Sequence, residues 1–343
     1  MPSKIEWTDE TWNPLRGCTR VSAGCEGCYA EGISARFSGP GMAFEGVAKM
    51  VHGKPHWTGQ IKLVPEKLAE PLRWRKPRMV FVNSMSDLFH EGVPDEFIDQ
   101  VFAVMALTPQ HTYQVLTKRP ERMAEYMKAL YAMERRVGDA AYELLNAGVE
   151  QADRSTLRPM ALFQHAFKSS FPNVWLGVSV EDQATADERI PHLLNTPAAV
   201  RFVSYEPALG TVDFTTICTG WYFIDALRGY RYYDEGPARA DCPSLDWIIC
   251  GGESGPNARP MHPDWARSVR DQCAEAGVPF FFKQWGEFLP IGQSSPGFPC
   301  AEADPEMAVT IEELNDHRSR VGKKAAGHLL DGVAHRGFPG RSE

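Results

Sequence analysis

The residues with the clearest chemical potential lie between Cys18 and Cys28, a stretch that holds three of the chain's eight cysteines. Six residues separate Cys18 from Cys25, and two separate Cys25 from Cys28. Gly24 and Gly27 let the backbone turn tightly, as a Cys-x2-Cys pair must if both sulfurs are to reach one metal. Three nearby thiolates without a fourth suit either a cubane iron–sulfur cluster with one open iron or a zinc site completed elsewhere.

Plainer interpretations of these cysteines remain open. They could pack in an unligated turn or pair as a disulfide, and a zinc site could take a histidine or Cys250 as its fourth ligand. The first residues form no secretion signal, and no apolar run reaches membrane-span length, so we expect a cytoplasmic protein without a membrane partner. Thiols stay reduced in the cytosol, where clustered cysteines bind metal more often than they form disulfides. We therefore expect Cys18, Cys25 and Cys28 to be metal ligands.

Composition indicates an ordinary globular protein. The chain has 343 residues, of which 43% are hydrophobic and 23% charged, enough for one α/β barrel with insertions. Its formal net charge of −8 argues against indiscriminate nucleic-acid binding. Two local basic clusters are either solvated faces or parts of a groove: Arg73, Arg75, Lys76 and Arg78, and then Lys118, Arg119 and Arg122.

The elements that must position these residues are strands that are apolar along their whole length. Such strands are buried on both faces, which predicts a parallel sheet covered by helices. The predicted strands are 5–12, 79–83, 111–116, 174–178, 200–203, 247–250 and 279–282, with helices over 94–107, from 121, over 184–195 and over 263–276. Six or seven such strands predict a partial (β/α)6-type parallel barrel, and a doubly wound open sheet is the alternative. We expect one barrel domain over 1–290, with insertions at about 130–170 and 214–244, and a C-terminal extension over 291–343 that packs on the barrel or trails from it.

Polar residues follow nearly every predicted strand. In barrels and open parallel sheets alike, ligands bind at the carboxyl ends of the strands, so these residues predict a site. Any single loop of this kind is explained equally well by helix capping. After the strand predicted over 247–250, Gly251 and Gly252 would let a ligand approach the backbone, and Glu253 would offer an anion to its ammonium or hydroxyl groups. The strand-end residues are Ser86, Asp87, Lys118, Ser179, Glu181, Ser204, Glu206, Glu253, Ser254 and Lys283.

Two other chemistries are not supported by the sequence. A serine nucleophile at Ser254 would need glycine at position 256, where the chain has Pro256. Lys323 lacks the preceding glycine-rich loop and the following Ser or Thr of a phosphate-binding P-loop.

Several of these motifs together resemble the three-cysteine phage and prophage protein family, which has radical-SAM-like character. The resemblance covers the chain from about 4 to 338, and the cysteine segment is its most specific part; 130–170 and 214–244 match least. The motifs are Trp12-Asn13-Pro14, Gly17-Cys18 through Cys28-Tyr29-Ala30, Val82 to Phe89, Leu116 to Pro120, Gly177 to Glu181, Gly251 to Gly255, and Val321 to Gly332.

The resemblance implies a partial barrel of the radical S-adenosylmethionine (SAM) kind. Three cysteines would hold a [4Fe–4S] cluster whose fourth iron chelates SAM, and an external electron donor would reduce it. Two departures matter: the first cysteine gap is six residues rather than the superfamily's three, and Gly-Gly-Glu follows a late strand rather than the second. Ser84, Ser86 and Asp87 could therefore replace Glu253 as partner of the methionine ammonium. The SAM-pocket residues expected on this basis are Ser84, Ser86, Asp87, Lys118, Ser179, Glu181, Glu206, Gly251, Gly252 and Glu253.

The resemblance makes a nucleic acid or nucleobase-type molecule the expected substrate. The aromatic-rich insertion around Trp221 to Tyr233 could stack bases beside a phosphate backbone, or it could close as a lid over a small molecule. The alternative function is a non-catalytic zinc or iron–sulfur protein that binds nucleic acid. The sequence does not indicate an oligomeric state.

Overall fold

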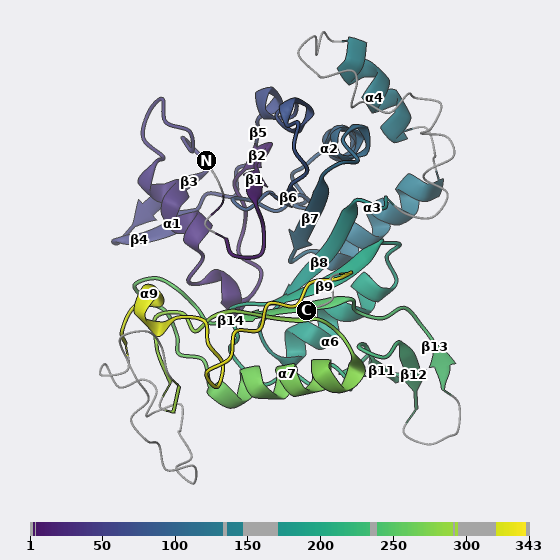
Figure 1. Cartoon of the computed structure of the whole chain (residues 1–343). Coiled ribbons are helices and arrows are strands. Elements are labelled where there is room, and N and C mark those ends of the chain that lie inside the picture. Colours follow the sequence, from purple (N-terminus) through teal and green to yellow (C-terminus); the bar gives the residue numbers. More distant parts are fainter. Residues whose placement is uncertain are drawn as a thin grey trace. The chain divides into compact units, whose positions relative to one another are not determined.

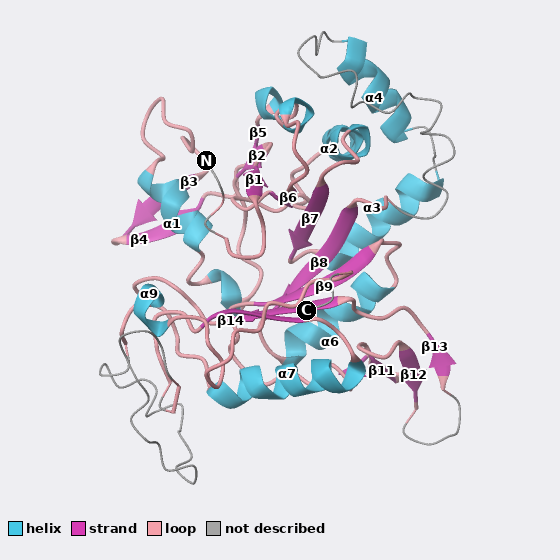
Figure 2. Cartoon of the chain, in the orientation of Figure 1, coloured by secondary structure: helices cyan, strands magenta, loops and turns pink. Residues whose placement is uncertain are grey.

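The computed structural model describes residues 3, 5–132, 136–146, 171–233, 239–290, 292–293 and 320–340. Strands and helices alternate along much of the chain, which confirms the α/β class (Figures 1 and 2). The strands are β1 (Glu10–Trp12), β2 (Leu15–Arg16), β3 (Ala48–Val51), β4 (Lys54–Trp57), β5 (Lys62–Leu63), β6 (Met79–Val82), β7 (Thr112–Thr117), β8 (Val174–Val180), β9 (Val200–Tyr205), β10 (Ile217–Cys218), β11 (Phe223–Asp225), β12 (Tyr230–Tyr232), β13 (Ala240–Asp241), β14 (Trp247–Gly251) and β15 (Phe280–Gln284). The α-helices are α1 (Tyr29–Arg36), α2 (Asp95–Leu107), α3 (Pro120–Ala132), α4 (Arg136–Asn146), α6 (Gln183–Leu194), α7 (Pro263–Ala276) and α9 (Lys323–Ala326), and short 3₁₀ turns cover Ala23–Cys25, Pro65–Lys67 and Pro71–Arg73.

The main sheet has seven strands in the order β1-β6-β7-β8-β9-β14-β15. The pairs β1–β6, β6–β7, β9–β14 and β14–β15 are parallel. The strands follow one another in chain order, whereas a doubly wound sheet reverses its order at a switch point. The doubly wound alternative is therefore wrong, and the order is consistent with a partial barrel.

The chain divides into two compact units. The first comprises Met1–Val21, Ala30–Gly177 and Asn195–Ala199, and the second comprises Ser22–Tyr29, Val178–Leu194 and Val200–Glu343. The boundary passes through the cysteine segment, so Cys18 belongs to the first unit, while Cys25 and Cys28 belong to the second.

In the first unit, β1, β6 and β7 pack against helices through large buried side chains. Trp12 and Tyr113 are fully buried, and their ring centroids lie 5.8 Å apart. Helix α2 begins after Pro94 with Asp95 in its first turn, where the positive end of the helix dipole favours a carboxylate. Phe102 of α2 then packs against Tyr126 of α3 at 5.6 Å. This burial fixes the carboxyl ends of β6 and β7, where several predicted site residues lie.

In the second unit, α6 and α7 lie on the same side of β9 and β14 (Figure 1). Helix α7 was predicted over 263–276, and that prediction is confirmed. Pro263 stands in its first turn, and the helix stops at Gly277, whose φ of +72° suits the left-handed cap that glycine adopts without strain. The segment 320–340 returns along β15, because Phe282 N donates to His335 O at 3.0 Å and Trp247 Nε1 to the carbonyl of residue 337 at 2.8 Å.

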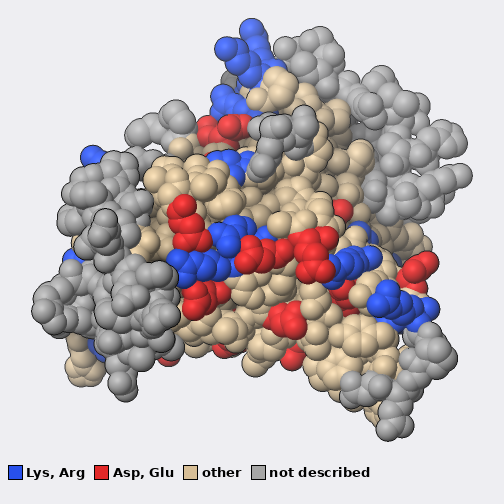
Figure 3. All heavy atoms as spheres, turned by 60° about the horizontal axis from the view of Figure 1, so that its bottom comes forward, with Lys and Arg blue, Asp and Glu red and all other residues tan. Residues whose placement is uncertain are grey.

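The expected insertions differ in how much of them the structure describes. Within 214–244, of which 234–238 lie outside the described residues, β10, β11, β12 and β13 form a four-stranded antiparallel sheet in that order. Of 130–170, α4 is described, whereas 133–135 and 147–170 lie outside the described residues, as do Cys300 and most of 291–319. Among the described residues, no helix combines the length and apolarity needed to span a bilayer. On the face shown in Figure 3, acidic and basic side chains are interspersed.

Candidate functional site

Cys25 and Cys28 stand on one tight turn in the second unit. Residues Ala23–Cys25 form a 3₁₀ turn, in which Cys25 N donates to Ser22 O at 3.0 Å. Cys28 N then donates to Cys25 O at 3.3 Å, which closes a second turn directly after the 3₁₀ turn and keeps the two cysteines three residues apart on a tightly folded backbone. Cys25 is buried and Cys28 partly exposed. The local backbone therefore suits two sulfurs that serve one ligand.

Glu181, directly after β8, accepts a hydrogen bond from the residue that precedes this turn. Its side chain is buried, one carboxylate oxygen accepts from Ser22 Oγ at 3.1 Å, and the other accepts from Arg189 Nη1 at 2.9 Å. A Cβ at Gly24 would lie 2.4 Å from Glu181 Oε1, which is closer than real Cβ contacts come. The buried carboxylate is thus neutralised by Arg189, and only glycine at position 24 leaves it room.

Glu253, after β14, holds the same turn through Arg259. Arg259 donates to both Glu253 oxygens at 2.8 Å and, through Nη2, to Ala23 O at 2.8 Å. A Cβ at Gly27 would lie 2.2 Å from Glu253 Oε1. The hydrogen bond to Glu253 raises the pKa of Arg259, burial opposes that rise, and the charge of Glu26 adds to it. The cysteine turn is therefore fixed by two strand-end carboxylates that act with two arginines.

Cys18 meets a third arginine within the first unit. Arg119, whose side chain is only 10% exposed, places Nη1 3.7 Å from Cys18 Sγ and 3.2 Å from Asp87 Oδ2. It also donates to Thr19 Oγ1 at 2.6 Å and to Glu91 Oε2 at 2.9 Å. Burial would lower the pKa of Arg119, but Asp87, Cys18 and Glu91 together raise it, so the guanidinium stays charged.

Asp87 organises the ends of β6 and β7 around this arginine. Its carboxylate accepts from Phe89 N at 3.0 Å, from Thr117 Oγ1 at 2.7 Å and from Lys118 N at 3.0 Å. The structure therefore brings Asp87 and Lys118 together as predicted, although it is the backbone of Lys118 that makes the described bond.

The two predicted serines of this loop bond to the segment after β1. Ser84 Oγ donates to Asn13 Oδ1 at 3.2 Å, and Ser86 Oγ donates to Leu15 O at 3.1 Å. These two bonds tie the loop after β6 to the residues that lead into Cys18.

Four further predicted residues lie at the ends of β9, β14 and β15: Glu206, Gly251, Gly252 and Lys283. Lys283 Nζ reaches both Glu206 oxygens, at 2.8 and 2.9 Å, and both side chains keep some exposure. A Cβ at Gly251 would be 3.4 Å from Glu206 and from Lys283, which is ordinary contact, so a small side chain would fit. A Cβ at Gly252 would be 2.0 Å from Trp285 O, so this glycine is required by packing against the chain.

Ser179, near the end of β8, is buried, as is Ser204 in β9, and Ser254 accepts from Gln284 Nε2 at 3.3 Å. The carbonyl of Ser179 accepts from Arg189 Nη1 at 2.9 Å, beside the bond that the same nitrogen makes to Glu181. Ser179 therefore shares the arginine that neutralises Glu181.

The donor chemistry of the cysteines fits a metal or an iron–sulfur cluster. Among the described residues the cysteines form no disulfide, so the disulfide interpretation is wrong for them. Within that same part of the chain, no group of three or more Cys, His, Asp or Glu side chains is gathered as a metal site. Cys250 is fully buried; burial, followed by the charges of Glu206 and Cys273, raises the pKa of its thiol.

Sequence reasoning missed the arginines that pair with the predicted carboxylates Asp87, Glu181 and Glu253. Arg119 was counted in a basic cluster, but it and Arg122 are paired: Arg122 donates to Val93 O at 2.6 Å and to Asp95 at 3.1 Å. These two arginines are therefore neither part of a solvated face nor free to form a basic groove. Arg189 and Arg259 carried no sequence signal, because an arginine in a helix or loop looks like any surface cation until its partner is known.

Together, the parallel sheet, the polar strand ends and the cysteine segment define an α/β protein in which each unit carries candidate site residues at the carboxyl ends of its strands. The chain belongs to the family described as Protein of unknown function (DUF5131), whose model matches residues 2–339. Neither the comparison with curated proteins nor that with solved structures found a match. The family match covers residues of both units, including the whole cysteine segment.

Proposed function

We propose that this protein is a radical SAM enzyme in which Cys18, Cys25 and Cys28 hold a [4Fe–4S] cluster. Its proposed substrate is a nucleic acid or a nucleobase-type molecule, and its proposed electron source is an external donor. When bound, such a cluster supplies the electron that cleaves SAM and so gives the 5′-deoxyadenosyl radical that abstracts hydrogen from a substrate.

The observation that carries the proposal is the support given to the cysteine turn. Gly24 and Gly27 lie against Glu181 and Glu253 at distances that admit no side chain. Each carboxylate is in turn held by an arginine. Ligand residues that must hold an inorganic group need such a rigid supporting layer, because loosely held ligands lose affinity.

Other residues of the chain have separable roles in this proposal. The N–H of Arg119 that reaches Cys18 Sγ would tune the cluster, since hydrogen bonds to ligand sulfurs shift the reduction potential. Glu206 and Lys283 offer one charge of each sign, which matches the ammonium and carboxylate groups of an amino-acid moiety such as that of SAM. Glu181 and Glu253 act as positioning residues for the cysteine turn.

The test is anaerobic reconstitution of the full chain with iron and sulfide, followed by absorption and electron paramagnetic resonance spectroscopy with and without SAM. We expect about four irons and four sulfides per chain, a spectral change on adding SAM, and release of 5′-deoxyadenosine on reduction. Cys25→Ala should abolish cluster assembly, whereas Cys218→Ala, at an exposed position on β10, should leave it intact.

Two results would contradict the proposal. Protein that binds only zinc, or that binds a cluster without cleaving SAM, would favour the non-catalytic nucleic-acid-binding alternative. Equal cluster content in Cys25→Ala and Cys218→Ala would show that the cysteine turn is not the ligand site.

A further inference from the structure

The insertion formed by β10 to β13 carries more exposed aromatic surface than its own folding requires. Trp221 is 88% exposed and Tyr233 is 52% exposed. Trp221 stands in the turn between β10 and β11, which is closed by the bond from Thr219 N to Tyr222 O at 3.0 Å. An indole held at the tip of a turn gains little from folding, and exposed aromatic residues of this kind are typical of binding surfaces.

One face of this small sheet carries a row of aromatic rings. The register places Phe223 opposite Tyr232, and side chains two apart in β12 share a face, so Tyr230 joins them. The Phe223 and Tyr232 rings are stacked, with centroids 5.6 Å apart, and Tyr230 lies 6.1 Å from Tyr232. The guanidinium of Arg239 lies 4.3 Å above the Tyr230 ring. The row therefore ends in a cation.

A second aromatic and cationic group lies beside the Trp221 turn. The Tyr222 and Tyr233 rings meet edge to face at 6.1 Å, and the guanidinium of Arg231 lies 5.7 Å above Tyr222. Side chains of Arg231 and Ile224 are cross-strand neighbours, and Ile224 is buried whereas Arg231 is exposed. A half-buried ring, an exposed ring and a stacked guanidinium thus occur together in this second group.

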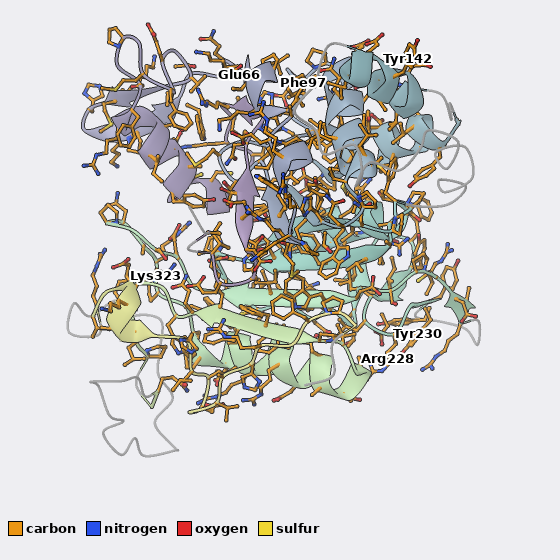
Figure 4. All side chains as sticks on the ribbon, turned by 45° about the horizontal axis from the view of Figure 1, so that its top comes forward. Glu66, Phe97, Tyr142, Arg228, Tyr230 and Lys323 are labelled. Atoms are coloured by element: carbon orange, nitrogen blue, oxygen red, sulfur yellow. The ribbon has the colours of Figure 1, made fainter. Side chains whose placement is uncertain are left out.

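The three arginines of this insertion, Arg228, Arg231 and Arg239, differ in their partners. Arg228 is neutralised by Asp225 at 2.9 Å and by Glu275 at 2.8 Å, and Figure 4 shows Arg228 next to Tyr230. In contrast, neither Arg231 nor Arg239 forms an ion pair with a carboxylate of the described residues. Both guanidinium groups are exposed and stacked on rings, and that of Arg231 also makes a hydrogen bond to Cys242.

We propose that the β10–β13 sheet binds single-stranded nucleic acid, with bases stacked on its exposed rings and phosphates paired with Arg231 and Arg239. Aromatic platforms beside cations bind unpaired strands without needing to read their sequence. A duplex is a poorer fit, because its bases are already stacked on one another. This inference rests on the proposed function, because it specifies the proposed nucleic-acid or nucleobase-type substrate as a single strand that this insertion binds.

The test measures fluorescence anisotropy of a labelled oligonucleotide of about 20 nucleotides with the full chain, without added iron or SAM. Single-stranded DNA, single-stranded RNA and the matching duplex are compared. We expect one or both single strands to bind more tightly than the duplex. Trp221→Ala should weaken that binding about tenfold, the loss of one base stack, and Arg231→Ala should reduce its salt dependence.

Matched controls come from elsewhere in the chain. Arg36 stacks on Phe37 at 5.8 Å, and both are exposed, so Arg36→Ala removes a similar stack from α1. Tyr142→Ala removes an aromatic side chain that is 57% exposed on α4 (Figure 4). Neither control should change binding, and unchanged melting temperatures would show that all four variants are folded.

Several outcomes would overturn the inference. These are no binding by the unaltered chain, equal binding of the duplex, equal losses in the controls, or a change in oligomeric state with Trp221→Ala while oligonucleotide binding is unaffected. Because binding is measured without the cluster, its failure is distinguishable from failure of the proposed radical chemistry, which is scored by 5′-deoxyadenosine release.

Discussion

Replacing Gly27 by alanine tests directly whether Glu253 supports the cysteine turn. The new Cβ would lie 2.2 Å from Glu253 Oε1, a separation that real Cβ atoms do not show. Glu253 has little freedom to retreat, because it is 6% exposed and Arg259 grips both of its oxygens. The backbone at Gly27 has no positive φ, so the substitution adds a steric conflict without adding strain.

The expected loss of stability is about 1–3 kcal/mol, the usual cost of forcing an extra methyl group into a packed site. Urea unfolding followed by far-UV circular dichroism measures this loss as a lower midpoint at constant slope. Gly32→Ala is the matched control. Gly32 lies in α1 with nothing within 4 Å of its missing Cβ, so alanine there should be neutral or should stabilise the helix by up to about 1 kcal/mol.

A double-mutant cycle sharpens the result. In a Glu253→Ala background the obstructing oxygens are gone, so adding Gly27→Ala should cost almost nothing further. The reasoning is refuted if Gly27→Ala is as stable as Gly32→Ala, or if it costs the same with and without Glu253.

Two other consequences follow from charge and burial. Burial alone would raise the pKa of Asp331. Hydrogen bonds from Arg267, Gln293 and Arg270 instead hold that pKa well below its usual 3.8. The ionised carboxylate therefore stabilises the fold above about pH 4. Asp331→Asn should cost about 1 kcal/mol at pH 7, and its deficit in urea unfolding should shrink as the pH falls below 4; a constant deficit would contradict this. For the thiols, burial raises the pKa of Cys273 to about 12 and also raises that of the fully buried Cys250. Iodoacetamide at pH 8 should therefore label the exposed Cys218 long before either, as judged by peptide mass spectrometry; early labelling of Cys250 or Cys273 would show that the β14–α7 packing is wrong.

Much of the fold was predictable because its signals are local. Continuous apolar runs located most strands of the main sheet to within a few residues. The first strand, predicted over 5–12, covers only Glu10–Trp12 in the structure. The helix over 263–276 was predictable from Pro263 at its start and Gly277 after its end. Such signals depend on residues within one turn or one strand of each other, which is the range over which the sequence can be read directly.

The sequence by itself determined that carboxylates, lysines and glycines follow the strands and that three thiols share one short segment. Only the tertiary structure decided what those groups touch. Glu181 and Glu253 carry the same strand-end signal as Glu206, yet both face the cysteine turn, across separations of 159 residues to Ser22 and 236 residues between Arg259 and Ala23. Local hydrophobic periodicity predicts which residues are buried. The partner of a buried charge depends instead on which distant segments the fold brings together, and no local pattern predicts that.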